Sequence, residues 1–250
     1  HYRATDETRL LDVAQRFADL ICDTFGAGDS QVPGVPGHPG IEMALVELAR
    51  ATGEARYLAQ ARYFLDARGY GLAGGQVYHL DHQPFRALKR LVGHAVRALY
   101  LGAGAADVYA EAGDPDLGET LARLWEYMVT RQMYISGGVG ARYQGEAFGE
   151  DYELPNSRAY AETCAAIGVV LWSWRMLQLQ GDAAYADMVE RVLYNAVLPG
   201  ISLEGEAYFY QNPLQSNGAH GRALWFDCAC CPPNVARVLA SLPGYLYSVS

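Results

Sequence analysis

Three of the five cysteines lie within four positions of the chain, at Cys228, Cys230 and Cys231. Pro232 and Pro233 follow directly, and paired prolines suit the first turn of a helix, where a missing backbone N–H costs nothing. The free N–H groups and the dipole at a helix N-terminus favour a thiolate over a thiol. Because a thiolate is both the nucleophilic and the metal-binding form of cysteine, this segment could support either chemistry.

A second cysteine segment could complete a metal site. Adjacent cysteines rarely reach disulfide geometry, whereas two thiolates can bind one metal ion from an irregular loop. Cys164 follows a carboxylate by two positions, so one carboxylate and three thiolates are available for four-coordinate zinc. Residues i and i+2 diverge on a regular helix, so the carboxylate must lie at a helix start or in a distorted turn. The alternative is a group of buried apolar cysteines. The candidate ligands are Glu162, Cys164, Cys230 and Cys231.

Glu146 is a candidate general acid, because it lies between Gly145 and Phe148 in a glycine-rich loop. Apolar neighbours could raise the pKa of its carboxyl group and so supply the protonated form. The alternative is that Glu146 belongs, with the other acidic residues of this loop, to a solvated acidic segment.

Two histidines and a tyrosine are candidate binding residues. His38 and His94 each follow a glycine at an expected helix start, from which a side chain can project into a central cavity. Tyr210 lies before the cysteine segment and could present its hydroxyl group there. The alternative for each histidine is a hydrogen-bonded core residue.

A repeated pattern of helix pairs must position these residues. At four places a helix ends at a small residue or glycine and an acidic residue opens the next helix, which is the capping chemistry of a tight turn. This repeat predicts an all-α protein, either a solenoid or a closed α/α toroid. The expected helices include residues 9–25, 57–67, one ending near 134, and 185–198. Residues 207–210 and 223–226 are expected to be short strands that lead into the cysteine segment.

The composition indicates a globular protein, because 51% of the residues are hydrophobic and only 19% are charged. A net charge of −9 disfavours nucleic acid or an anionic membrane as a partner. No apolar stretch reaches the roughly 18 to 20 residues that a membrane span requires. An odd number of cysteines, two of them adjacent, fits a reducing compartment, so a cytoplasmic location is expected.

Five segments together resemble glycoside hydrolase family 127, the β-L-arabinofuranosidases. Their order and spacing extend through most of the chain. The segments are Gly93-His94-Ala95-Val96-Arg97, Gly145-Glu146-Ala147-Phe148, Tyr160-Ala161-Glu162-Thr163-Cys164, Tyr210-Gln211-Asn212-Pro213-Leu214 and Cys230-Cys231-Pro232-Pro233-Asn234.

The resemblance implies an (α/α)6 catalytic barrel and a retaining glycosidase that acts on a small carbohydrate. It also implies a zinc ion held by one glutamate and three cysteines, one of which is the nucleophile. The implied positions are Glu162, Cys164, Cys230 and Cys231 for zinc, Cys230 as nucleophile, Glu146 as acid/base, and His38, His94 and Tyr210 as sugar contacts.

The resemblance further implies that the family's chains are longer than this one. We expect residues 1–250 to form one catalytic domain, without the first helices of the barrel and without the β-rich domains that follow it. Activity of this exact polypeptide, and its oligomeric state, are left open. The alternatives are a glycosidase for another furanose or deoxy sugar, and a zinc-stabilised carbohydrate-binding or scaffold domain without turnover. Cys228 is an extra thiol that could compete with Cys230 as a ligand.

Overall fold

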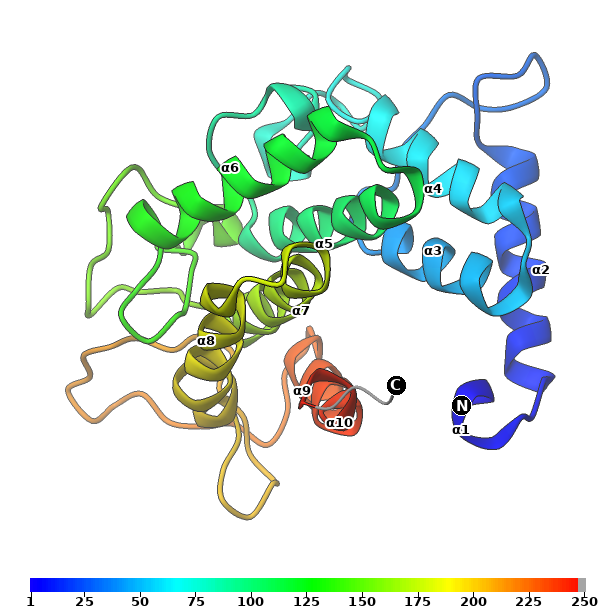
Figure 1. The fold of residues 1–250 in the computed structure, drawn as a ribbon. Helices are drawn as coiled ribbons and strands as arrows, with labels where there is room; N and C mark the ends of the chain where they lie inside the picture. The colour runs from blue at the N-terminus through cyan, green and yellow to red at the C-terminus, as the bar shows by residue number, and fades with distance from the viewer. Residues whose placement is uncertain (247–250) are drawn as a thin grey trace.

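The computed structural model describes residues 1–246 and is built almost entirely of helices (Figure 1). Short non-α turns interrupt the long connections or extend a helix end. The α-helices are α1 (Tyr2–Thr5), α2 (Arg9–Thr24), α3 (Ile41–Thr52), α4 (Ala55–Ala67), α5 (Ala95–Ala112), α6 (Pro115–Arg131), α7 (Thr163–Gln180), α8 (Ala183–Val192), α9 (Cys231–Ser241) and α10 (Pro243–Leu246).

The helices form an inner and an outer row. Helices α3, α5, α7 and α9 pack against one another in sequence as the inner row, and α4, α6 and α8 lie outside them (Figure 1). The two rows curve together into an arc. This arrangement confirms the predicted all-α toroid of helix pairs.

Tight turns join each inner helix to its outer partner. Helix α5 ends at Gly113, whose φ of 66° is a left-handed conformation that favours glycine. Asp114 then caps α6, and Asp182 caps α8, each by accepting a backbone N–H bond from the first turn of its helix. The predicted cap chemistry is therefore confirmed at these two turns.

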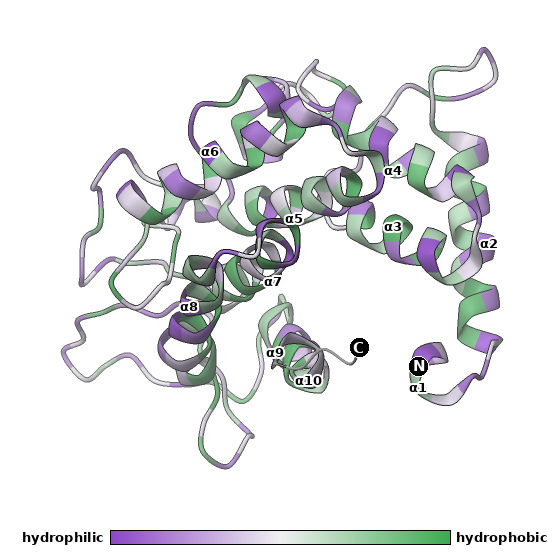
Figure 2. Ribbon diagram, in the orientation of Figure 1, coloured by the Kyte–Doolittle hydropathy of each residue, from purple (hydrophilic) through white to green (hydrophobic). Residues whose placement is uncertain are grey.

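The two central inner helices, α5 and α7, are buried along most of their length. A Cβ atom added at Gly168 of α7 would lie only 2.7 Å from Cβ of Leu99 on α5, so the two backbones approach closely there. Hydrophilic residues are frequent on the outer helix α6, whereas α5 and α7 are mostly apolar (Figure 2). Among the described helices, none combines the length and the apolarity that crossing a membrane would need.

Three expectations for the helices and strands are wrong. Helix α6 ends at Arg131, three residues before the expected position, and α8 gives way after Val192 to a π-helical turn and then a 3-10 turn. The expected strands at 207–210 and 223–226 do not form in the described chain. Between these two segments the described chain has one pair of backbone hydrogen bonds, of 2.8 and 2.9 Å, which Tyr208 and Ala223 exchange.

Candidate active site

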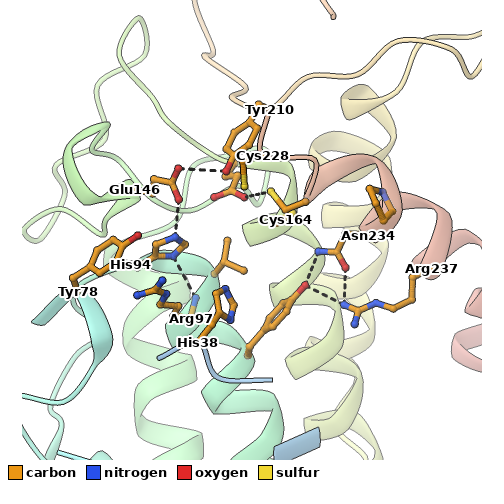
Figure 3. A pocket seen from close by; sticks show the side chains of 15 residues that line it. His38, Tyr78, His94, Arg97, Glu146, Cys164, Tyr210, Cys228, Asn234 and Arg237 are labelled. Atoms are coloured by element: carbon orange, nitrogen blue, oxygen red, sulfur yellow. Dashed lines mark hydrogen bonds and ion pairs between the residues drawn. The ribbon is translucent and has the colours of Figure 1, made fainter. Parts of the chain in front are cut away.

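The candidate residues meet in one pocket of about 530 Å³ at the N-terminal ends of three inner helices (Figure 3). His94, Glu162 and Cys230 are the N-cap residues of α5, α7 and α9. The pocket walls therefore come from segments that are far apart in the sequence. The predicted site residues that line it are His38, His94, Glu146, Glu162, Cys164, Tyr210 and Cys230, together with the extra Cys228.

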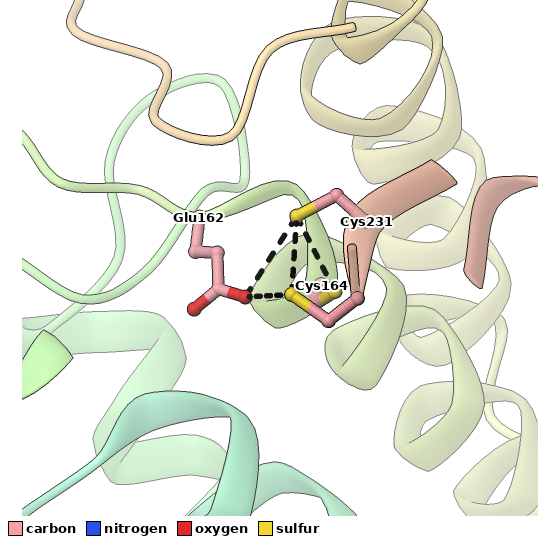
Figure 4. A group of neighbouring side chains, drawn as sticks. Glu162, Cys164 and Cys231 are labelled. Carbon is pink, nitrogen blue, oxygen red and sulfur yellow. Dashed lines mark hydrogen bonds between the residues drawn. The ribbon is translucent and has the colours of Figure 1, made fainter. Parts of the chain in front are cut away.

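One side of the pocket holds the predicted metal ligands. Cys231 lies behind the pocket wall, fully buried, and all four ligand atoms lie within 4.8 Å of one another. Figure 4 shows the side chains of Glu162, Cys164 and Cys231 directed at a common centre. Because Glu162 caps α7, it lies at a helix start, as joint ligation requires. Cys228 is exposed and is not part of this group.

The spacing of these atoms fits zinc. Two sulfurs at ~2.3 Å from a tetrahedral zinc ion lie about 3.8 Å apart. Here the Sγ of Cys231 lies 3.4 Å from that of Cys164 and 3.7 Å from that of Cys230. Glu162 Oε1 lies 3.5 Å from Cys230 Sγ, and Glu162 Oε2 is buried without a hydrogen-bond partner in the described chain. An orphaned buried carboxylate oxygen beside three thiols calls for a cation.

The pKa shifts of these four residues also support a metal site. Burial, and then the neighbouring Cys230, raise the pKa of Glu162 to about 9. The thiols of Cys164 and Cys231 donate to Cys230, which lowers the pKa of Cys230 to about 2 and raises that of Cys164. Of the three thiols in this group, only that of Cys230 has a lowered pKa. A divalent cation would allow its neighbours to ionise as well.

Next to the metal ligands, Glu146 accepts three hydrogen bonds, and a carboxylate oxygen of Glu146 lies within 4.8 Å of one of Glu162. His94 Nε2 lies 2.6 Å from Oε2 of Glu146, and the hydroxyl group of Tyr210 lies 3.3 Å from its Oε1 (Figure 3). The hydroxyl group of Tyr160 lies 2.6 Å from the same Oε1. The bond from His94 is the main cause of a lowered pKa for Glu146, with burial opposing it and Tyr160 adding to it. The expectation that apolar neighbours raise this pKa is wrong, because the neighbours are polar.

The tautomer of His94 follows from its position. Its Nδ1 accepts the backbone N–H of Arg97 at 3.4 Å, which caps α5. In the neutral ring the hydrogen must then be on Nε2, which donates it to Glu146. His94 therefore contacts the candidate acid directly, in addition to lining the pocket.

His38 lies in the same wall. Its ring makes edge contacts with His94 and Tyr100, with centroids 6.0 and 5.8 Å apart. Its Nδ1 lies 2.6 Å from the carbonyl oxygen of Pro39, and burial lowers its pKa. A neutral His38 thus offers Nε2 as the ring nitrogen that can meet a ligand.

Several pocket residues were not foreseen. Arg97 and Tyr100 follow His94 at intervals of three, so they share its face of α5, and helical spacing could have identified them. Asn234 similarly continues the cysteine segment into α9. No comparable signal marks Tyr78, which comes from the long connection before α5. The unforeseen residues in the pocket wall are Tyr78, Val96, Arg97, Tyr100, Pro233, Asn234 and Arg237.

Comparison with known proteins finds close relatives. Residues 1–244 match the family described as "Beta-L-arabinofuranosidase, GH127 catalytic domain". A curated relative, a non-reducing end β-L-arabinofuranosidase of Bifidobacterium longum subsp. longum, is 36% identical over 99% of this chain and 42% of its own length.

Two solved structures are similar over 100% of this chain. One is a GH127 β-arabinofuranosidase with a TM-score of 0.96 and 50% identity, of which 39% is covered. The other is a GH127 β-L-arabinofuranosidase from Geobacillus stearothermophilus T6 with a TM-score of 0.94 and 43% identity, of which 44% is covered. The present chain therefore spans less than half the length of each of these proteins.

Proposed function

This chain belongs to the GH127 family of β-L-arabinofuranosidase catalytic domains, and on this basis we propose that it releases L-arabinofuranose from β-L-arabinofuranosides with retention of configuration. The supporting observation is that Cys230, whose pKa is lowered by the neighbouring thiols, and Glu146, a hydrogen-bonded carboxyl group, line one pocket. A nucleophile and an acid/base that face one sugar-sized space are the parts that a retaining mechanism needs.

In the first step, the thiolate of Cys230 attacks the anomeric carbon and forms a C–S bond. The C–O bond to the leaving group breaks, and Glu146 donates a proton to the departing oxygen. In the second step, Glu146 removes a proton from water while the water oxygen attacks the same carbon. The C–S bond then breaks, and Cys230 returns as a thiolate.

The residues that would hold zinc are Glu162, Cys164, Cys230 and Cys231, whose atoms have suitable spacing and one orphaned oxygen. When bound, zinc would keep Cys230 ionised and would make the sulfur a better leaving group in the second step. Glu162 occupies the N-cap position of α7, which places its carboxylate beside the thiols of Cys230 and Cys231.

The remaining walls would bind the sugar. His38 and Tyr210 present polar atoms to the pocket, and Tyr78 and Tyr100 add aromatic surface against which a ring can pack. We propose that these side chains contact the arabinofuranose hydroxyl groups and ring.

The first test is release of p-nitrophenol from p-nitrophenyl β-L-arabinofuranoside by wild-type protein and by Cys230→Ser. We expect wild-type release and a drop to the uncatalysed rate in Cys230→Ser, with fold and zinc content measured in parallel. Cys228→Ser is the matched control, because Cys228 lines the same pocket but lies outside the metal group. That variant should keep most of the activity.

Wild-type turnover in Cys230→Ser would refute the nucleophile. No release by the folded, zinc-loaded chain would refute the assigned activity, and release of a different furanose or a deoxy sugar would then identify a related glycosidase.

A further inference from the structure

The hydroxyl group of Tyr160 lies 2.6 Å from Oε1 of Glu146, the shortest distance from any hydroxyl group to that carboxyl. We propose that Tyr160 is a positioning residue that holds Glu146 in the orientation needed for proton transfer, a role that rests on the proposed function. Tyr160 is 5% exposed and is not among the described residues that line the pocket. It therefore reaches Glu146 from behind and acts on the substrate only through it.

The three hydrogen bonds to Glu146 specify which oxygen transfers the proton. A carboxylate has about four lone-pair sites, two on each oxygen. Tyr160 and Tyr210 both donate to Oε1, whereas Oε2 receives one bond, from His94. The remaining site is therefore on Oε2. Oε2 carries the proton to the leaving oxygen, and Tyr160 keeps Oε1 turned away from it.

Tyr160 is itself fixed in place, which a positioning residue requires. Its carbonyl oxygen accepts the backbone N–H of Asn212 at 3.0 Å, and the next residue donates its N–H to the carbonyl of Gly140 at 2.8 Å. Its ring makes an edge contact with Tyr143, with centroids 4.9 Å apart. The hydroxyl group is thus held at one point relative to the loop that carries Glu146.

The backbone conformation of Glu146 is a second reason why the bond from Tyr160 matters. Glu146 has a φ of 48°, a left-handed conformation that is uncommon for a residue with a side chain. Backbone bonds between Arg142 and Ala147, both 3.0 Å, close the loop around it. Side-chain bonds on both carboxyl oxygens then leave the group little freedom to rotate.

The test compares Tyr160→Phe with wild type on two substrates, a p-nitrophenyl and a methyl β-L-arabinofuranoside. The variant keeps the ring and loses only the hydroxyl group. A bond from a hydroxyl to a carboxylate, acting through an acid catalyst, predicts about a 10- to 100-fold loss of kcat on the methyl glycoside. We expect less than about a 3-fold loss of kcat/KM on the nitrophenyl glycoside, whose departure needs little proton transfer, and an unchanged KM.

Tyr143→Phe is the matched control, because Tyr143 packs on the ring of Tyr160 and bonds to Glu146 only through its backbone carbonyl, at 3.1 Å, which the substitution keeps. It should behave as wild type on both substrates. Zinc content is measured in every variant, since Tyr160 lies two residues before Glu162. A chain that keeps its zinc and loses turnover selectively on the methyl glycoside supports the proposal.

Equal losses on both substrates, loss of zinc, or behaviour like Tyr143→Phe would each overturn it. The proposed function fails in a different way. If wild-type protein releases no arabinose, or if Glu146→Gln costs nothing on the methyl glycoside, the assigned reaction is wrong and the role of Tyr160 falls with it.

Discussion

One carboxyl group, that of Glu146, must act as an acid in the first step of the proposed reaction and as a base in the second. Its hydrogen bonds from His94 and Tyr160 lower its pKa and so favour the ionised form in the free protein. The free protein therefore already favours the form of Glu146 that acts as a base. To act as an acid, Glu146 must take up a proton before the leaving group departs. The thiol of Cys230, whose pKa is also lowered, lines the same pocket.

Glu146→Gln tests the acid role, because glutamine keeps the shape of the side chain and cannot donate a catalytic proton. General acid catalysis contributes about 10² to 10⁴-fold, so we expect a kcat/KM loss of that size on poor leaving groups and a much smaller one on p-nitrophenyl glycosides. Zinc content should not change. Steady-state kinetics on a leaving-group series measures this.

A suitable control is Glu150→Gln, which changes a carboxylate of the same loop that pairs with Arg90 instead of facing the pocket. It should leave both substrates unaffected. Equal losses from Glu146→Gln on good and poor leaving groups would contradict the assignment.

Sequence patterns named residues that meet in one pocket, but they did not predict the surroundings of those residues. The cysteine segment, Glu146 and His94 were identifiable because their types and spacing are unusual. The pKa direction of Glu146 was wrong because its hydrogen-bond donors, His94 and Tyr210, are distant in sequence. Tyr160 was quoted only as part of a motif, since nothing in one sequence shows which side chain its hydroxyl group will meet.

Among the elements, two long connections before the inner helices carry His38 and Tyr78 to the pocket. Buried polar groups hold them. Arg68 donates from one guanidinium to the carbonyl oxygens of Pro36 and His79, at 2.6 and 2.8 Å, and so ties the two connections together. Asp81 accepts three backbone N–H bonds within the second connection, from the residues at 69, 73 and 75.

Asp81→Asn should therefore destabilise the protein. An amide has one acceptor oxygen in place of two, so at least one buried N–H loses its partner, at a cost of about 1–3 kcal/mol. Urea unfolding followed by circular dichroism measures the change in free energy of unfolding. Asp29→Asn, at an exposed loop position, is the control and should change it by less than about 0.5 kcal/mol. Equal stability of the two variants would contradict the role given to Asp81.

Asp81 also makes the stability of the protein depend on pH, and the direction of its pKa shift gives the sign. Burial raises the pKa of Asp81, but the backbone N–H bonds outweigh it and the net pKa is lowered from 3.8. A lowered pKa means that the contribution of Asp81 to stability is fully present above pH 3.8 and is lost as the pH falls below it. The wild-type protein should lose more stability between pH 5 and 3 than Asp81→Asn does.

Helix pairs were predictable because their turns use local chemistry, as at Gly113 and Asp114. The end of α6 was not, because residues beyond Arg131 still look helical and leave the helix only to form the loop that carries Glu146. The expected strands were wrong because the pairing is limited to Tyr208 and Ala223, and how far two distant segments pair is not visible in a local pattern.

At the scale of the whole molecule, the candidate metal ligands come from both α7 and α9, so a bound metal would connect α9 to the rest of the arc. Cys230 and Cys231 belong to α9, whereas Glu162 and Cys164 begin α7. A ligand at 100 times its Kd stabilises a fold by about 2.7 kcal/mol, and each kcal/mol shifts Tm by roughly 2–4 °C in a protein of this size. Stripping zinc with a chelator should therefore lower Tm by about 5–10 °C.

Cys164→Ser provides the control, because it removes one ligand without touching the proposed nucleophile. Its Tm should already be low and should not respond to the chelator. Scanning calorimetry with metal analysis follows both quantities. If the chelator removes the metal and the wild-type Tm does not change, the group has no structural role.

The contact between Gly168 and Leu99 bears on how new specificities can be made from this scaffold. There is no spare room between the backbone of Gly168 and the side chain of Leu99. A substitution that widened the distance between α5 and α7 would therefore also move the pocket residues at the start of both helices. Some positions in the connections that carry His38, Tyr78 and Glu146 do have room, since a Cβ atom added at Gly37 would meet nothing within 4 Å. A directed-evolution library for other sugars should therefore vary these connections and leave the inner helices untouched.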